Sequence, residues 1–142
     1  AALGFFARAD ERSPRNGGVK AGLARALLML DNHREALRQF EAARALGVPD
    51  LQVARDRGLA HDLNGDARRA QQDYALALTR GPDDEVIKRF ALSLAITGQR
   101  DQALRMLDPL LYKRDQGAWR ARAFVLALTG DAAGASRIVR QV

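Results

Sequence analysis

An alanine that recurs about every 34 residues is the feature that most constrains the fold of this sequence. A large side chain follows it by four positions in each copy, as at Phe40, Tyr74 and Leu107, and a small or apolar residue often follows three positions later. Residues at these spacings lie on one face of an α-helix. Such regularity predicts a stack of similar helical units, none of which buries its apolar face alone. The alanines are Ala2, Ala36, Ala70, Ala103 and Ala135, at spacings of 34, 34, 33 and 32 residues.

A second helix is predicted before each of these helices except the first, and it carries a small residue of its own. Gly65, Gly98 and Gly130 mark the turn between the two helices, because glycine adopts the left-handed conformation that commonly follows a helix end. Asp31 departs from this pattern in the first pair. A small residue on each helix allows the paired backbones to approach closely. The small residues of the preceding helices are Ala24, Gly58, Ala91 and Ala123.

Prolines mark the other connections, since proline cannot continue a helix. Pro14, Pro49 and Pro82 separate successive units. Pro109 falls inside a predicted helix, which we expect to kink or end early there. The carboxylates after Pro82 are interpreted as a helix cap that complements the helix dipole. These marks predict a lone helix at about 1–12, followed by helix pairs at about 17–46, 51–80, 84–112 and 116–141.

The composition agrees with an all-α fold. A chain of 142 residues with 47% apolar and 28% charged residues lies in the globular range and can bury a core. Alanine, leucine and arginine are abundant, whereas β-branched and aromatic residues are sparse. The absence of cysteine excludes disulfides, a thiol nucleophile and a cysteine-ligated zinc site. No apolar run approaches the roughly 20 residues that span a bilayer.

The repeated positions together resemble the tetratricopeptide repeat (TPR) family: a small residue at position 8 of the repeat, another at 20, an aromatic at 24, a small residue at 27 and a proline near 32. The resemblance implies an all-α, right-handed superhelical solenoid of antiparallel helix pairs. It covers nearly the whole chain as one array, with a partial repeat at 1–16, repeats at 17–50, 51–83 and 84–115, and a truncated repeat at 116–142. The best copy carries Gly58, Gly65, Ala70, Tyr74, Ala77 and Pro82.

A narrower resemblance is to the TadD-type proteins of tight-adherence (Flp) pilus assembly. It rests on the segment GLAHDLNGDARRAQQDYALALTRGPDD and on LSLAITGQRDQALRML after it. It implies a bacterial lipoprotein on the periplasmic side of the outer membrane that helps to assemble a secretin; otherwise a cytoplasmic location is expected. Because the first copy contains only a second helix, we expect the sequence to be a segment of a longer one.

In the family's arrangement, the first helices of successive repeats line a concave face. Carrying over its positions 5 and 9 predicts a basic row beside an apolar row, suited to a protein or peptide with acidic and hydrophobic side chains. The alternatives are that arginine is merely abundant here and that some of the leucines pack inside the array. The predicted groove residues are Arg25, Arg55, Leu59, Lys88, Leu92, Arg120 and Phe124.

Nothing in the sequence indicates an enzyme, a cofactor or a metal site. His33 and His61 fall in different repeats, and Ser13, Ser93 and Ser136 have no histidine at plausible reach. The expected function is therefore that of a protein-binding scaffold or assembly factor. An array that regulates a larger enzyme or sensor remains an alternative.

Nucleic-acid binding is a further alternative, because the net charge is +6 and 20 of the 23 basic residues are arginines. Against it, basic and acidic residues alternate along the chain, and only two tyrosines and one tryptophan are present on which nucleic-acid bases could stack. A clamp for a C-terminal carboxylate of the chaperone-binding type is not expected either, since Asn16, Asn32 and Asn64 all fall in connections.

Overall fold

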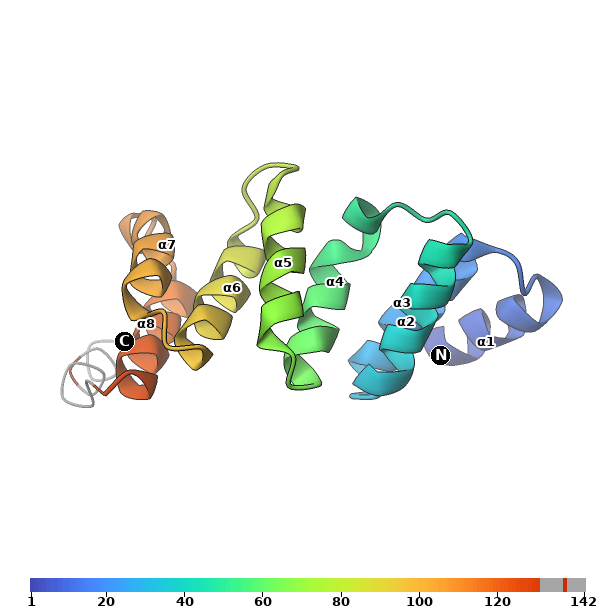
Figure 1. The fold of residues 1–142 in the computed structure, drawn as a ribbon, viewed down its shortest axis with the longest axis horizontal. Coiled ribbons are helices and arrows are strands. Elements are labelled where there is room, and N and C mark those ends of the chain that lie inside the picture. The colour runs from blue at the N-terminus through green and yellow to red at the C-terminus, as the bar shows by residue number, and fades with distance from the viewer. Residues whose placement is uncertain (131–136, 138–142) are drawn as a thin grey trace. The chain divides into compact units, whose positions relative to one another are not determined.

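The computed structural model describes residues 1–130 and residue 137, and within them the chain forms eight α-helices and no strand (Figure 1). The all-α repeat fold predicted from the sequence is confirmed, and its helices begin and end close to the predicted positions. Ala135 and Val139, which mark the second helix of the last pair, lie outside the described residues. The helices are α1 (Ala2–Arg12), α2 (Gly17–Met29), α3 (His33–Ala45), α4 (Asp50–Leu63), α5 (Ala67–Leu78), α6 (Asp84–Ile96), α7 (Arg100–Tyr112) and α8 (Gln116–Leu128).

The chain divides into two compact units, residues 1–77 and 78–142. The first holds α1 to α5, and the second holds α6, α7 and α8. In the first unit, α2 packs on α3 and α4, and α1 packs on α2. In the second, α6 packs on both α7 and α8. Within each unit, helices that come first in their repeats therefore lie beside one another.

The recurring small residues lie where the helices of a pair meet. Ala24, Ala36, Ala91 and Ala103 are completely buried. A close approach occurs at Gly58 of α4, where a Cβ atom would lie only 2.7 Å from the Cε1 atom of Tyr74 on α5. Figure 1 shows these two helices side by side. The repeated small residues thus have the packing role predicted for them.

The turns between helices follow the sequence marks, with one substitution. Gly65, Gly98 and Gly130 all have positive φ, as predicted. Asp31 takes the same left-handed conformation in the first pair, with φ of 61°. An aspartate tolerates this region better than most residues but still less well than glycine. The departure in sequence therefore leaves the turn conformation unchanged.

The early helix end expected at Pro109 does not occur, because α7 continues through it to Tyr112. Proline removes one backbone donor, so the carbonyl of Arg105 lacks its usual partner. Both residues are exposed, and water can satisfy that carbonyl. The helix cap predicted after Pro82 is confirmed: Asp83 caps α6 by accepting hydrogen bonds from the backbone N–H groups of Glu85 and Val86.

None of the described helices is long and apolar enough to cross a bilayer.

Candidate interaction surfaces

The residues predicted to line a groove lie on the first helices of the repeats, in two groups. Arg25 is on α2, and Arg55 and Leu59 are on α4, all in the first unit. The other group, Lys88, Leu92, Arg120 and Phe124, lies on α6 and α8 of the second unit. Each group is held on a pair of contacting helices.

In the first unit, one of the predicted groove residues, Arg25, forms an ion pair within the protein, although its side chain is 64% exposed. The Nε atom of Arg25 lies 3.0 Å from Oδ2 of Asp56 on α4, so this ion pair joins α2 to α4. Arg55 is exposed. Leu59 is half-buried and packs against the core of the unit. This surface therefore presents little exposed apolar area at the predicted positions.

Lys88 is also engaged within its unit. Its Nζ atom lies 3.4 Å from Oδ2 of Asp115, at the start of α8, and 3.8 Å from Oε2 of Glu85. Asp115 caps α8, and the hydrogen bond from the backbone N–H of Ala118, with the charge of Lys88, holds the pKa of this carboxyl below its usual range. Lys88 thus positions α8 against α6 as well as adding positive charge to the surface.

Phe124 is the most conspicuous predicted residue, because 62% of it is exposed. Arg120 precedes it by one helical turn and is exposed too. Among the residues that the structure describes, Arg120 forms no ion pair. Leu92 on α6 is half-buried against the core. The second unit therefore presents a basic and an aromatic side chain on one stripe of α8.

Sequence reasoning missed a further apolar row at the ends of the first helices. Each of these helices ends in a large apolar side chain with about half or more of its surface exposed. In the repeat numbering these residues share position 13, so the same periodicity that revealed the core could have revealed them. The residues, hereafter the end row, are Met29, Leu63, Ile96 and Leu128, with exposed fractions of 80%, 48%, 64% and 56%.

A polar cluster between α4 and α5 was also missed. Arg57 donates from Nε and Nη2 to the two carboxylate oxygens of Asp73, at 2.8 and 2.7 Å. It also donates to Oδ1 of Asp50, at 2.8 Å. Asp73 is only 6% exposed, so the charge is buried but fully paired. Tyr74, which follows Asp73 and is the aromatic residue of the repeat pattern, donates from its hydroxyl to Oδ2 of Asp62 at 2.9 Å.

The charges of this cluster are mutually stabilised. The hydrogen bonds to Asp73 raise the pKa of Arg57, and the hydrogen bond from Arg57 lowers the pKa of Asp50. Burial lowers the pKa of His61, whose Nε2 atom lies 3.8 Å from Oδ2 of Asp73. At neutral pH the cluster therefore holds a neutral imidazole beside a paired guanidinium and carboxylate.

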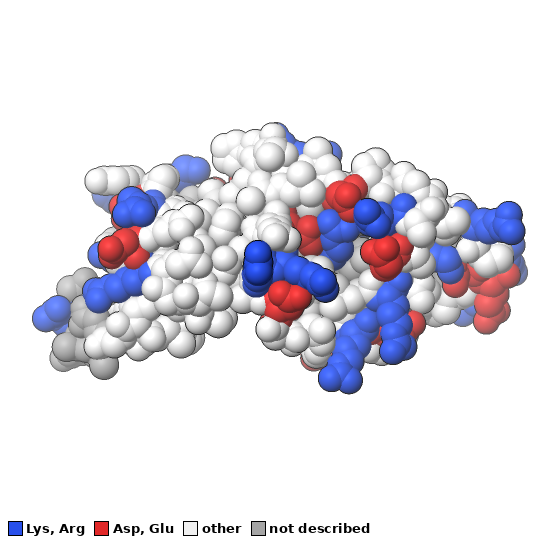
Figure 2. Space-filling view, in the orientation of Figure 1, with Lys and Arg blue, Asp and Glu red and all other residues white. Residues whose placement is uncertain are grey.

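The cluster forms the floor of a cleft of about 610 Å³ in the first unit. Arg44, on α3, joins its rim and bonds to both Glu41 and Asp50. Over the same unit, Figure 2 shows basic and acidic side chains interleaved rather than gathered by sign. The cleft contains no serine, threonine or cysteine nucleophile, and no group of three metal-ligating residues occurs in the described part of the chain. The ion pairs of the cluster join α3, α4 and α5.

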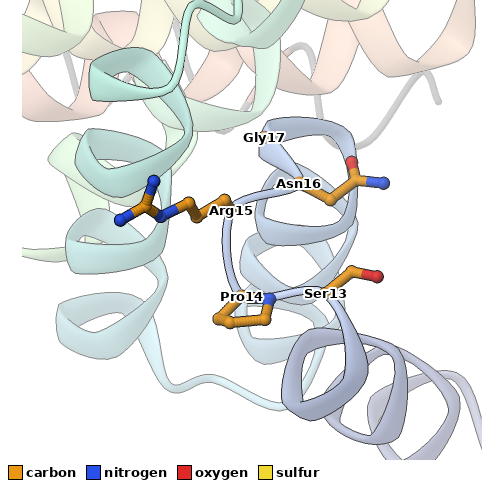
Figure 3. A pocket seen from close by; sticks show the side chains of 5 residues that line it. All are labelled: Ser13, Pro14, Arg15, Asn16 and Gly17. Carbon is orange, nitrogen blue, oxygen red and sulfur yellow. The ribbon is translucent and has the colours of Figure 1, made fainter.

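A second hollow, of about 700 Å³, lies at the connection between α1 and α2. Figure 3 shows that its side chains do not converge: Arg15 points to one side, and Ser13 and Asn16 point to the other. Asn16 is engaged as the cap of α2, where it accepts a hydrogen bond from the N–H of Val19. This hollow offers no assembled binding site.

No protein-family profile matches the sequence, and no curated protein is significantly similar to it. Solved structures do match its fold. The MamA protein superposes with a TM-score of 0.77 at 12% identity, over 99% of this chain and 78% of that one. YrrB, described as a TPR protein with an unusual peptide-binding site, gives a TM-score of 0.78 at 18% identity, over 98% and 73%.

A third match is a single-residue variant of the nearly identical TPR-like repeats of a putative kinesin light chain from Podosopora anserina. It gives a TM-score of 0.77 at 14% identity, over 98% of this chain and 82% of that one. At these identities the likeness concerns the fold alone. The chain has the all-α helical-repeat fold of TPR proteins.

Proposed function

We propose that this chain is a non-enzymatic scaffold that binds a segment of another protein on a surface formed by first helices within a unit, above all α6 and α8 of the second unit. The observation that carries the proposal is the exposure of Phe124, 62% of which faces solvent although it lies between the buried residues Ala123 and Val125. An isolated exposed apolar residue is ordinary, but here Leu128 is also exposed on α8, and Ile96 is exposed on the contacting helix α6. The peptide-binding site named for YrrB, a protein of the same fold, supports the idea.

The surrounding charge favours an acidic partner. Arg120 lies one turn before Phe124 and has no carboxylate partner among the described residues. Arg55 adds an exposed positive charge in the first unit. These arginines and Phe124 all belong to the groove residues predicted from the sequence, which are Arg25, Arg55, Leu59, Lys88, Leu92, Arg120 and Phe124. Of these, Arg25 and Lys88 also form ion pairs with carboxylates of neighbouring helices.

A pull-down from an extract of the source cells tests this function. We expect partners to be retained by the wild-type protein and lost by a variant that combines Arg120→Glu with Phe124→Ser. The matched control is Tyr112→Ser on α7, because Tyr112 is 89% exposed in the same unit but lies on another helix. Recovery of the same partners at the same strength by all three proteins would contradict the proposal. Arg55→Glu extends the test to the first unit.

The concrete setting that we propose is pilus assembly, from the resemblance to TadD-type proteins. In that setting the intact protein sits at the periplasmic side of the outer membrane, and its partner is a component of the secretin complex. Fractionation of cells that express the intact protein checks the setting separately. Its recovery with the cytoplasm would remove the pilus role and leave the scaffold function to be judged by the pull-down.

A further inference from the structure

We infer that the partner of the second unit is an amphipathic α-helix, which rests its apolar side on Ile96, Phe124 and Leu128 and turns an acidic residue toward Arg120. The inference rests on the proposed function and specifies the partner for the surface on α6 and α8. It uses the end row, which the predicted groove did not include. Three observations lead to it: the matching order of cationic and apolar residues along the two helices, the absence of hydrogen-bonding side chains from their apolar ends, and the distribution of their charges.

The two helices carry matching stripes, in which a cation is followed by apolar residues in the same order along the chain. On α8, Arg120, Phe124 and Leu128 follow one another at intervals of one turn. On α6, Lys88, Leu92 and Ile96 do the same. Residues four apart on a helix lie on one face, about 6 Å apart along the axis. Because α6 and α8 contact each other, the two stripes lie on neighbouring helices, and in each stripe a cation precedes two large apolar side chains.

The apolar end of the surface offers almost nothing to the backbone of an extended peptide. The cations of the two stripes, Lys88 and Arg120, lie nearer the helix starts, whereas Leu92, Ile96, Phe124 and Leu128 carry no hydrogen-bonding group, and Ser93 is only 1% exposed. The backbone groups of the two helices are already bonded within the helices. A strand laid over Ile96, Phe124 and Leu128 would leave its own N–H and C=O groups without partners. A helix satisfies its backbone internally and presents only side chains, which is what this surface can accept.

The charges fix the second requirement of the partner. The carboxylates of α6 and of the start of α8 are Asp84, Glu85 and Asp115, all near helix N-termini. Asp115 and Glu85 pair with Lys88, and Asp108 of α7 lies 3.9 Å from Arg122. Of the two stripe cations, Lys88 is therefore paired, whereas Arg120 has no carboxylate partner among the described residues of this unit. A partner carboxylate placed one turn from its first apolar anchor complements it.

A peptide-display selection on the intact protein tests the inference. Random peptides of about 16 residues, long enough for roughly four helical turns, serve as the probe. Enriched sequences are then measured against variants by fluorescence anisotropy. We expect an acidic residue three or four positions from a large apolar residue, with a second apolar residue one turn further on. A proline placed at the centre of an enriched peptide should abolish binding, because it breaks the helix.

The variants separate this surface from the rest of the unit. Ile96→Ser and Leu128→Ser should each weaken an enriched peptide about tenfold or more, as expected for a buried apolar anchor. Arg120→Gln should weaken it and remove the preference for the acidic residue. Tyr112→Ser should leave binding unchanged. Both end-row residues are more than half exposed, so their replacement is not expected to unfold the unit.

The outcomes distinguish failure of the inference from failure of the proposed function. Peptides that depend on Phe124 but tolerate a central proline, or that bind Ile96→Ser and Leu128→Ser as well as the wild type, would overturn the helical partner and leave the scaffold function standing. Absence of any enriched peptide, together with a pull-down that is insensitive to Arg120→Glu and Phe124→Ser, would overturn both.

Discussion

The helix pairs α4–α5 and α6–α7 belong to successive repeats, yet they meet through different chemistry. In α4–α5, Arg57 and Asp73 form a buried ion pair. The equivalent residues of α6–α7 are Phe90 and Met106, which pack against an apolar core. One repeat pattern therefore accommodates either chemistry, provided that every buried charge is paired. The sequence positions that set the helix approach are small in both pairs, so the backbone arrangement does not depend on the choice.

The largest effect should come from breaking the buried pair on one side. Asp73→Ala leaves the guanidinium of Arg57, 15% exposed, with only Asp50 as a carboxylate partner. We expect a loss of about 3 kcal/mol in the free energy of unfolding, measured by urea denaturation followed by circular dichroism.

The double variant Arg57→Met with Asp73→Met is the matched control, because it gives α4–α5 the apolar chemistry of α6–α7. We expect its stability to lie within about 1 kcal/mol of the wild type. An equal loss in the single and double variants would show that the ion pair is not what distinguishes the two helix pairs.

A smaller loss should follow Gly58→Ala. The added Cβ would lie 2.7 and 2.9 Å from the Cε1 and Cδ1 atoms of the Tyr74 ring, whereas α6 already carries Ala91 opposite Leu107. We expect a cost of about 1 to 3 kcal/mol, from the same denaturation measurement. Adding Tyr74→Leu should make the alanine tolerable. A single variant as stable as the wild type would contradict the close approach at Gly58.

The turns that follow α2 and α6 offer a comparison of the opposite sign. Asp31→Gly should stabilise the protein by up to about 1 kcal/mol, since a glycine at φ of 61° avoids the Cβ clash. Gly98→Ala, at φ of 80°, should destabilise it by about the same amount. A lower melting temperature for Asp31→Gly would show that the aspartate side chain contributes more than its backbone strain costs.

The smallest effect concerns acid. Because burial lowers the pKa of His61 in the folded state from its ordinary 6.5, the unfolded chain binds the proton more readily. Stability from the neutral imidazole is complete above about pH 6.5 and declines as the pH falls toward the folded-state pKa. His61→Gln should therefore flatten the dependence of unfolding free energy on pH between about pH 7.5 and 5.5. An unchanged slope would count against a buried, neutral His61.

The fold was predictable from the sequence because its determinants are periodic. A small residue every 34 or so positions and a glycine at three of the four turns within pairs are local signals that repeat, and the helix positions predicted from them are close to those observed. Asp31 shows the limit of such signals: the turn needs a backbone conformation, and aspartate also reaches it. Pro109 shows another, since a proline near the exposed end of a helix costs too little to stop it.

The surfaces were less predictable, because they depend on which side chains pair across helices. Lys88 was predicted correctly to lie on α6, but its pairing with Asp115, 27 residues away, follows only from the packing of α8. Arg57 and Asp73 likewise became visible as a pair only in the folded unit. The end row could have been noticed in the sequence, since Met29, Leu63, Ile96 and Leu128 share one repeat position. Their spacing does not distinguish them from core residues, however, and only the structure shows that they are exposed.

The proposed binding surface on α6 and α8 is tested most directly by mapping where a selected peptide binds. Nuclear magnetic resonance spectra of the isotopically labelled protein, recorded with and without the peptide, should show the largest shifts at Ile96, Phe124 and Leu128, with smaller ones at Leu92 and Arg120. Shifts centred instead on Tyr112 of α7, or on the polar cleft around Asp73, would contradict the proposed surface.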